Sequence, residues 1–281
     1  MVAKLLEGKQ IAETIKAELK SQIAALRSKP VLASIMVGEN VGSEAYAKSQ
    51  AKTAEALGVI YQPHKFVSDT SQAQLSEFIG ELNSDNRVNG IILQMPLPDH
   101  LDYKKAISLI KPEKDVEGIH PENMGKLICG SGRVVPCTAN AVMELLNSTQ
   151  TDLYGKEAVI VGHSGIVGKP LALLLLEKLV TVTVCHIATS KANKLKEHVA
   201  RAEILIVATG KPELIKGSWI REDAIVIDVG ISRVGGKLVG DVEFEAAKTK
   251  ASFITPVPGG VGPLTVAMLM RNLVACVRAQ L

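Results

Sequence analysis

The sequence predicts an α/β protein built on parallel sheets, and three observations lead to this prediction. Segments with helical periodicity alternate with strand-like apolar runs along almost the whole chain. A length of 281 residues allows one large domain or two ordinary ones. Apolar residues make up 47% of the chain and charged residues 22%, which is typical of a globular protein and unlike a disordered one.

The first half of the chain is predicted to consist of repeated αβ units. A stripe at helical spacing ends at Lys29-Pro30 and is formed by Ile11, Ile15, Leu19, Ile23 and Leu26. Strands are expected over residues 31–38, 59–66 and 90–96, with a helix over 43–57. The pair Ser71 and Gln74 forms a capping-box pattern, which predicts the start of a helix. The apolar face of that helix is Leu75, Phe78, Ile79 and Leu82.

A second α/β series follows a hinge-like stretch around residues 135–138. It opens with a helix bearing Val142, Leu145 and Leu146. Strands are then expected over residues 158–161, 181–185, 204–208, 224–229 and 253–257. We therefore predict a first domain over residues 1–140 and a second over 141–263. We expect the last helix, over residues 264–281, to pack back on the first domain.

Composition also excludes several classes of function. The net charge is only +3, and no basic tract with stacking aromatics occurs, so nucleic acid is not an expected partner. The N-terminus lacks the apolar core of a secretory signal, and the most apolar run, Leu171 to Leu176, is too short to span a bilayer. Four cysteines have neither paired nor metal-binding spacing, namely Cys129, Cys137, Cys185 and Cys276. We therefore expect free thiols, a cytoplasmic location and no bound metal.

A glycine-rich turn marks a candidate dinucleotide site. The strand Ala158–Val161 leads into Gly162-His163-Ser164-Gly165-Ile166-Val167-Gly168, followed by an apolar helix. Such a turn lets the backbone approach a pyrophosphate, and the helix N-terminus adds amide donors and a positive dipole. The spacing is G-x-x-G-x-x-G rather than the strict G-x-G-x-x-G. A tight strand–helix turn that binds no ligand is therefore an alternative interpretation at this point. Small residues at later strand ends, in Thr209-Gly210 and at Gly230, favour a cofactor crevice.

Four further motifs make the chain recognisable. They are Leu93 through Pro98 (LQMPLP), Pro112 through Gly118 (PEKDVEG), Gly162 through Pro170, and Thr255 through Pro263 (TPVPGGVGP). With these motifs in this order, the whole chain resembles the methylenetetrahydrofolate dehydrogenase/methenyltetrahydrofolate cyclohydrolase family. The resemblance implies two α/β domains around a cleft, an N-terminal catalytic domain and a C-terminal Rossmann-type domain that binds NAD(P). It also implies a homodimer and a one-carbon unit carried on tetrahydrofolate.

The resemblance assigns site residues position by position. Its catalytic positions are occupied by Tyr46, Gln50, Gln94 and Glu117. Its substrate positions are occupied by Tyr46, Gln94, Asp115, Glu117, Pro258, Gly259, Gly260 and Thr265. Its cofactor positions are occupied by Thr138, Gly162, His163, Ser164, Gly165, Ile166, His186, Ile187, Thr209, Gly210, Gly230 and Ile231. The competing interpretations are a packing role for Tyr46, a turn-satisfying role for Gln94 and a solvated acid at Glu117. Asp228 is expected to brace a strand end rather than to take part in the chemistry.

Two positions depart from the family pattern. Gln50 stands where the family normally has a lysine, four residues after Tyr46 on the same helix face. Glu117 replaces the second aspartate of the usual Asp-Val-Asp-Gly run. Removing a hydride from the methylene carbon needs no proton carrier on the protein, whereas hydrolysis of the methenyl product does. We therefore expect dehydrogenase activity with weak or absent cyclohydrolase activity.

Three alternatives remain at this stage. The first is a fully bifunctional enzyme in which another group supplies the proton. The second is a non-catalytic protein that binds folate and nucleotide, and the third is a dehydrogenase acting on another substrate.

The identity of the cofactor rests on the surroundings of the ribose 2′-hydroxyl. His163 and Ile187 stand where many family members have arginine or serine, and Lys191 and Lys194 are the candidate cations for a phosphate contact. The strand also lacks the terminal acid that usually selects NAD. The sequence favours NAD weakly over NADP.

Overall fold

The computed structural model describes residues 2–280, and the chain divides into two compact units. One unit holds the N-terminal segment up to Glu13 together with Thr138–Thr265, and the other holds Thr14–Cys137 together with the C-terminal segment from Val266. The division falls within α1 (Gly8–Ala24) and within α11 (Val261–Ala279). The residues up to Glu13 therefore group with Thr138–Thr265, whereas the sequence analysis placed them in a first domain over residues 1–140. The physical reason is a short strand, β1 (Lys4–Leu5), that pairs with β11 (Phe253–Ile254).

The larger unit contains a six-stranded parallel sheet in the order β1-β11-β8-β7-β5-β6. Its remaining strands are β5 (Glu157–Val161), β6 (Thr181–Cys185), β7 (Ile204–Val207) and β8 (Ile225–Asp228). The helices are α6 (Cys137–Ser148), α7 (Gly168–Leu176), α8 (Ile187–Lys191), α9 (Leu195–Arg201) and α10 (Phe244–Lys248). Strands β6 and β7 lie on either side of β5, so the winding of the sheet reverses there. In doubly wound sheets, ligands bind at this reversal, outside the carboxyl ends of the strands.

Two small features complete this unit and were not predicted. The strands β9 (Ser232–Val234) and β10 (Lys237–Val239) form an antiparallel hairpin, and η2 (Gly217–Trp219) is a single 3₁₀ turn. β11 ends at Ile254, so it is shorter than the predicted strand over residues 253–257. The other predicted strands of this unit agree with the structure to within about one residue at each end.

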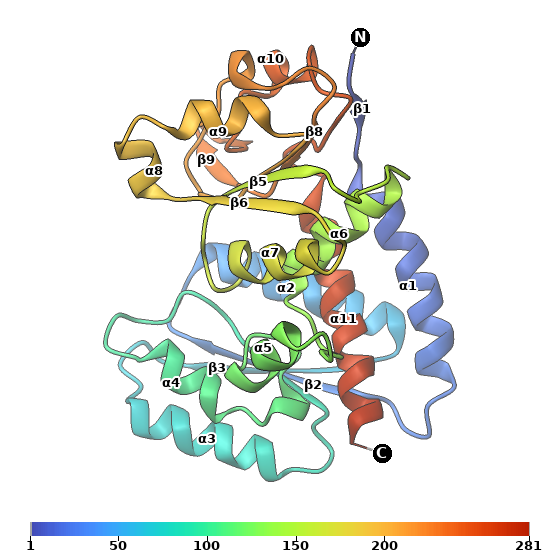
Figure 1. Ribbon diagram of the computed structural model, residues 1–281. Helices are drawn as coiled ribbons and strands as arrows, with labels where there is room; N and C mark the ends of the chain where they lie inside the picture. Colours follow the sequence, from blue (N-terminus) through green and yellow to red (C-terminus); the bar gives the residue numbers. More distant parts are fainter. Residues whose placement is uncertain (1, 281) are drawn as a thin grey trace. The chain divides into compact units, whose positions relative to one another are not determined.

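The smaller unit contains a three-stranded parallel sheet in the order β3-β2-β4. Its strands are β2 (Val31–Val37), β3 (Ile60–Phe66) and β4 (Gly90–Leu93). Its helices are α2 (Val41–Leu57), α3 (Gln72–Ser84), α4 (Tyr103–Leu109) and α5 (Pro121–Ile128), with a 3₁₀ turn η1 at Pro112–Lys114. Figure 1 shows α3 and α4 on one side of this sheet and α2 on the other.

The two faces of β2 differ in chemistry, because successive side chains of a strand point to opposite faces. Val31, Ala33, Ile35 and Val37 join a buried apolar cluster with residues of α3 and α4. The intervening Ser34 is 3% exposed and bonds instead to a polar side chain, described below. One face of the sheet is therefore an ordinary core, and the other carries buried polar groups.

Local signals explain where the helices begin and end. The predicted capping box at Ser71 and Gln74 is present at the start of α3. α2 begins two residues earlier than predicted because the Asn40 side chain accepts from the Ser43 amide, and it ends at Gly58 in a left-handed conformation. β4 stops at Leu93, three residues short of the prediction, and a cis peptide joins Met95 to Pro96.

Among residues 2–280, one helix is long and apolar enough to span a membrane by length and composition alone. α11 has a mean hydropathy of 1.3 over the tested window, and 67% of that window is buried within the protein. Such burial is that of a core helix. The sequence prediction had singled out only the shorter apolar run within α7.

Candidate active site

The carboxyl end of the larger sheet carries a pocket of about 270 Å³. Its walls come from the segments after β5, β6 and β7, which is the place where the winding reverses. Six residues predicted for the cofactor line it, namely Gly162, His163, Ser164, His186, Ile187 and Thr209. Apolar side chains, including Leu195 and Leu214, close the inner side. The other predicted cofactor residues, Thr138, Gly165, Ile166, Gly210, Gly230 and Ile231, do not line this pocket.

The glycines of the first turn serve different physical purposes. A Cβ on Gly162 would lie 2.3 Å from the Ala208 carbonyl oxygen, and Gly162 has a φ of +126°. A Cβ on Gly168 would lie 2.0 Å from the Gly162 carbonyl oxygen. Both positions therefore need glycine for the turn to close on itself. Gly165 lies between them with open space around its Cβ direction, so a phosphate group can approach the backbone there.

The structure reveals a cation in the pocket wall that the sequence prediction missed. Lys211, two residues after Thr209, lines the pocket together with Ser190. Neither Lys191 nor Lys194, the two lysines considered from sequence, is among the lining residues. The distance along the chain between Lys211 and the glycine turn hides this contact. Only the parallel pairing of β5 with β7 brings the two segments together.

Two buried carboxylates brace the turns beside this pocket. Asp241 is fully buried, and its Oδ2 accepts from the Thr209 amide at 2.6 Å, the Gly210 amide at 2.9 Å and the Thr209 hydroxyl at 2.9 Å. Asp228 accepts from the amides of Gly230, Asp241 and Val242. Burial, with a smaller contribution from the charge of Asp241, raises the pKa of Asp228 to about 6. Asp228 thus braces a strand end as predicted, and Asp241 is a second brace that sequence reasoning missed.

The smaller unit holds a buried polar cluster on the α2 side of its sheet. Gln50 of α2 and Gln94, just after β4, are 0% and 3% exposed. Gln94 Nε2 donates to Gln50 Oε1 at 2.7 Å and to Ser34 Oγ at 3.0 Å, and the Tyr61 hydroxyl donates to Gln50 Oε1 at 3.2 Å. Gln50 Nε2 has no hydrogen-bond partner among the described residues. A buried amide donor without a partner costs free energy, so this atom points to a ligand that accepts a hydrogen bond.

Tyr46 and Glu117 belong to the same neighbourhood. Burial raises the pKa of Tyr46, and the charges of Cys137 and Glu117 raise it further, whereas the neighbouring Gln50 amide lowers it. Burial, and then the charge of Asp115, raises the pKa of Glu117 to about 8. Glu117 Oε2 is fully covered and has no partner in the described part of the chain. The structure thus brings the four predicted catalytic positions together.

Tyr103, at the first turn of α4, is an addition to this set. Its hydroxyl is buried without a partner among residues 2–280, and burial followed by the charge of Glu117 raises its pKa. Nothing in the sequence singled it out, because α4 reads as an ordinary amphipathic helix.

Asp115 has a structural role in place of the predicted contact with substrate. Its Oδ1 accepts from the amides of Glu117 and Gly118, and its Oδ2 accepts from the His120 amide and from Asn123 Nδ2. Asp115 is 2% exposed. Four internal donors occupy the carboxylate, so it closes the loop that carries Glu117, and this geometry gives a substrate contact no support.

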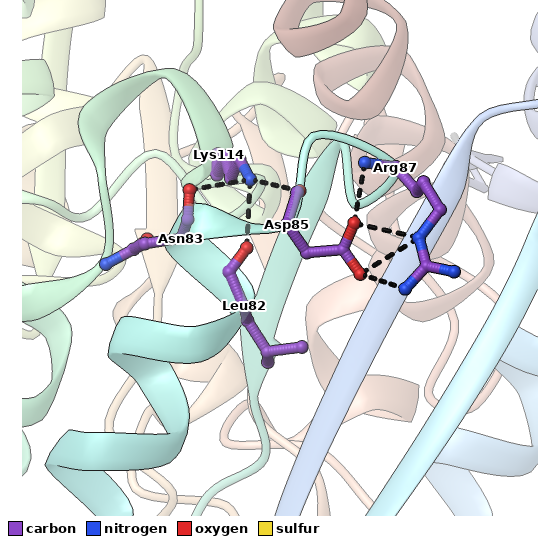
Figure 2. A network of polar contacts seen from close by, with 5 residues as sticks. All are labelled: Leu82, Asn83, Asp85, Arg87 and Lys114. Carbon is purple, nitrogen blue, oxygen red and sulfur yellow. Dashed lines mark hydrogen bonds and ion pairs between the residues drawn. The ribbon is translucent and has the colours of Figure 1, made fainter.

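A buried lysine anchors the other end of this loop. Figure 2 shows Lys114 Nζ donating to the backbone carbonyls of Leu82, Asn83 and Asp85, at 2.9, 3.0 and 2.8 Å. Leu82 and Asn83 contribute two of the last carbonyls of α3, which have no partner inside the helix, and Asp85 is its C-cap. The ammonium therefore caps α3 and ties it to the residue before Asp115. Arg87 pairs with Asp85 beside it and holds the pKa of that carboxyl at about 2 through its hydrogen bonds.

The glycine-proline segment before α11 packs tightly against the start of α1. The Gly8 amide donates to the Gly259 carbonyl at 3.0 Å, and a Cβ on Gly8 would overlap the Gly260 carbonyl oxygen. A cis peptide precedes Pro258, and the Thr265 hydroxyl donates to the Val261 carbonyl within α11. These contacts give the predicted substrate residues of this segment a fixed backbone.

Comparison with known proteins identifies the family. A family model described as the NAD(P)-binding domain of tetrahydrofolate dehydrogenase/cyclohydrolase matches residues 136–281, and the model of its catalytic domain matches residues 6–117. The chain belongs to the tetrahydrofolate dehydrogenase/cyclohydrolase family. Both the predicted resemblance and the predicted α/β fold with a Rossmann-type domain are therefore confirmed.

Relatives across this family are similar over their full length. The bifunctional protein FolD of Moorella thermoacetica is 48% identical over 282 residues, which cover 99% of this chain and 100% of that protein. The FolD methylenetetrahydrofolate dehydrogenase/cyclohydrolase structure from Campylobacter jejuni has a TM-score of 0.95 at 44% identity, covering 99% of this chain and 100% of that one. The enzyme from Trypanosoma brucei, solved with NADP and an inhibitor, has a TM-score of 0.95 at 37% identity, covering 99% and 98%.

Proposed function

We propose that this enzyme oxidises 5,10-methylenetetrahydrofolate to 5,10-methenyltetrahydrofolate and that its hydrolysis of the methenyl product is weak. The observation that supports this most directly is Gln50, a buried amide that cannot carry a proton, in a cluster whose members carry no ammonium group. Membership of a dehydrogenase/cyclohydrolase family supports the reaction class.

The residues of the larger unit fit a nicotinamide dinucleotide. The turn closed by Gly162 and Gly168 leaves room at Gly165 for phosphate, and the adjoining pocket offers an apolar interior for an adenine ring. A bound nicotinamide supplies the hydride acceptor. The protein's own part is to fix the two reactants at a near-attack separation of about 3–3.5 Å and to exclude water.

The residues of the smaller unit fit a folate ring system. Six buried polar side-chain atoms lack partners among the described residues, and three of them belong to this neighbourhood, namely Gln50 Nε2, Glu117 Oε2 and the Tyr103 hydroxyl oxygen. Together they offer donors and an acceptor to a polar heterocycle, and Tyr46 adds an aromatic face. The oxidation leaves a cation that the folate nitrogens stabilise, so these side chains need only bind and orient the substrate for that step.

Hydrolysis places a different demand on the same groups. Water must add to the methenyl carbon, and ring opening requires proton transfer to a nitrogen, which a positioned acid–base group accelerates about 10²–10⁴-fold. An amide at position 50 donates a hydrogen bond but does not exchange a proton at a useful pKa. We therefore expect hydrolysis to lag far behind oxidation.

A fully bifunctional enzyme is the second candidate, and Glu117 is the observation that favours it. Its raised pKa of about 8 makes this carboxyl titratable near neutral pH, as a general acid–base group requires. In that case the longer side chain at position 117 has taken over the proton transfer that lysine performs in relatives.

A paired assay tests the proposal and separates the two candidates. Purified protein is supplied with methylenetetrahydrofolate and either NAD or NADP, and methenyltetrahydrofolate hydrolysis is then followed against the uncatalysed rate. Oxidation with hydrolysis at least tenfold slower supports the dehydrogenase. Comparable rates of oxidation and hydrolysis would contradict the proposal. A hydrolysis rate that depends on pH near 8 and is lost in Glu117→Gln would support the bifunctional candidate instead.

We further propose that NAD is the preferred cofactor, because His163 and Ile187 offer a 2′-phosphate no permanent charge. Lys211 opposes this preference without reversing it, since one exposed cation contributes at most about 1 kcal/mol. A kcat/KM ratio that favours NADP by tenfold or more would contradict the preference.

A further inference from the structure

Two hydroxyl side chains belong to the buried polar cluster of the smaller unit, and the sequence analysis assigned a role to neither. Ser34 lies in β2 and Tyr61 lies in β3. Both stand outside the four motifs that carry the family resemblance. Their hydroxyls nonetheless form hydrogen bonds with the two glutamines of the cluster, Gln94 and Gln50.

The register of the sheet places these side chains in a row. Leu32 of β2 pairs with Tyr61, and Ser34 pairs with Ile92 of β4. Residues that pair across a parallel sheet share a face, and successive residues of one strand alternate between faces. Ser34 therefore shares a face with Leu32, and Gln94 shares a face with Ile92. The two hydroxyls and the Gln94 amide thus lie along three neighbouring segments on the face that α2 covers (Figure 1).

Two donors determine which end of the Gln50 amide is free. Gln50 Oε1 accepts from Gln94 Nε2 at 2.7 Å and from the Tyr61 hydroxyl at 3.2 Å. Gln50 Nε2 has no hydrogen-bond partner among the described residues. Gln50 cannot reverse on its own, because its Nε2 would then face Gln94 Nε2, and two donors form no hydrogen bond. The free end of this buried amide is therefore its donor.

Ser34 fixes the orientation of Gln94 in turn. An amide nitrogen carries two protons, and Gln94 Nε2 donates to Gln50 Oε1 and to Ser34 Oγ at 3.0 Å. Ser34 and Gln94 are each only 3% exposed, so bulk water does not compete for these contacts. A long side chain that is already held in one orientation loses less conformational entropy when a ligand binds. The hydrogen bonds of the two hydroxyls therefore prepare the Gln50 amide for a ligand.

Tyr61 reaches this buried amide from the surface of the unit. Its side chain lines a hollow of about 480 Å³ near the end of α2, together with Lys29 and Glu55. Its hydroxyl donates inward to Gln50, which is fully buried. Burial raises the pKa of Tyr61, and the neighbouring Ser34 hydroxyl lowers it. The net shift is upward, so the hydroxyl is a neutral donor at the pH of an ordinary assay.

We propose that Tyr61 and Ser34 are positioning residues, which hold the Gln50 amide with its Nε2 presented to the folate substrate. The proposal rests on the proposed function as a methylenetetrahydrofolate dehydrogenase. Tyr61 touches no reacting atom and acts only through Gln50. The cluster is matched to an amide at position 50, because an amide oxygen accepts from the Tyr61 hydroxyl and from Gln94, whereas a lysine offers no acceptor.

The first test compares the oxidation kinetics of the natural chain, Tyr61→Phe and Ser34→Ala. Phenylalanine keeps the ring beside the hollow and removes only the hydroxyl. No proton moves at Gln50 during hydride removal, so its contact with folate is equally strong in the ground state and the transition state, and weakening it changes KM rather than kcat. We expect the KM for methylenetetrahydrofolate to rise about threefold to tenfold in Tyr61→Phe and about threefold in Ser34→Ala. The kcat and the KM for the cofactor are expected to stay within about twofold.

A double-substitution experiment separates positioning from a direct or a structural role. Gln50→Met removes the amide that Tyr61 holds. If Tyr61 acts through Gln50, adding Tyr61→Phe to Gln50→Met changes the folate KM by less than about twofold. The same experiment with Ser34→Ala decides the question if Tyr61→Phe does not fold. Tyr154→Phe changes an exposed tyrosine of the other unit and, as the matched control, is expected to leave both constants unchanged.

Failure of this proposal and failure of the proposed function are distinguishable. An unchanged folate KM in a folded Tyr61→Phe, even with a lower urea midpoint, overturns the proposal, as does a KM rise of the same size in the Gln50→Met background. Calorimetry with tetrahydrofolate under nitrogen measures binding alone, because this probe lacks the carbon that is oxidised. If Tyr61→Phe weakens that binding only when Gln50 is present, while the natural chain does not oxidise methylenetetrahydrofolate, the positioning role stands and the proposed reaction falls.

Discussion

Replacing Gln50 with lysine is the most direct test of whether the buried polar cluster supports oxidation but not hydrolysis. The substitution puts an ammonium group where the structure has an unpartnered amide nitrogen, on the same face of α2 as Tyr46. Burial lowers the pKa of a lysine towards neutrality, which suits a group that must both give and take a proton. We expect hydrolysis of methenyltetrahydrofolate to rise about 10²–10⁴-fold, the usual contribution of a general acid–base group.

The structure also predicts what this substitution costs in stability. Gln50 Oε1 accepts from Gln94 Nε2 and from the Tyr61 hydroxyl, and lysine provides no acceptor. The Gln94 amide can rotate and present its oxygen to the ammonium, which restores one hydrogen bond. One donor then lacks its partner, and we expect a loss of about 1–3 kcal/mol in the free energy of unfolding. Urea titration of the two proteins measures that loss.

The assay follows both reactions in the natural chain, Gln50→Lys and Gln50→Met, the last of which keeps the volume without a proton or a hydrogen bond. Hydrolysis is expected to rise only in Gln50→Lys, and oxidation is expected to persist in all three. A folded Gln50→Lys that binds folate but hydrolyses no faster than the natural chain would refute the assignment of this role to position 50.

Three more predictions concern the groups that hold the site together. Glu117→Gln is expected to be more stable to unfolding than the unsubstituted chain at pH 8, by on the order of 4 kcal/mol, and this difference in stability is expected to be small near pH 4.5. The raised pKa of Glu117, about 8, means that ionisation above pH 4.5 opposes folding, and urea titrations at the two pH values measure this. Lys114→Met is expected to destabilise the chain by about 2 kcal/mol, measured in the same way, since three carbonyls lose their donor. Asp241→Asn is expected to raise the KM for the nicotinamide cofactor about tenfold and to leave the folate KM unchanged, because its carboxylate orders the Thr209–Gly210 turn.

The sequence predicted most of the fold because its parallel strands are short apolar runs bounded by turn residues. β5, β6 and β7 were each placed to within about one residue. The errors share a physical cause. β1 is two residues long and exists only because β11 pairs with it, and such a pairing leaves no local signal. The predicted strand over 90–96 is longer than β4. After Leu93, only one more sheet-like hydrogen bond forms, from the Gln94 amide to the Ile35 carbonyl, before the chain turns.

The candidate site likewise contains residues that the sequence predicts and residues that only the structure reveals. Residues that a motif places, such as Gly162 and Gln94, were found from sequence, whereas residues that act through long-range contacts were not. Asp241 and Lys211 meet the cofactor turns only after β5, β7 and β8 have paired, and they lie in unremarkable loops of the chain. Asp115 is a different case. The motif marked it correctly as important, but only the structure reveals that its four hydrogen bonds all serve its own loop.

The buried atoms without partners connect stability to function in this protein. Each such atom costs about 1–3 kcal/mol in the ligand-free protein, and ordinary cores avoid them. Gln50 Nε2, Glu117 Oε2 and the Tyr103 hydroxyl are nonetheless held in one unit by elements that are otherwise well bonded, including the Lys114 cap and the Asp115 loop. A ligand that forms hydrogen bonds with these atoms recovers their free-energy cost on binding. Internal hydrogen-bond partners would instead stabilise the ligand-free protein and weaken the complex. The chain therefore gives up stability at the positions where folate is proposed to bind, and stabilising substitutions there are expected to raise the folate KM.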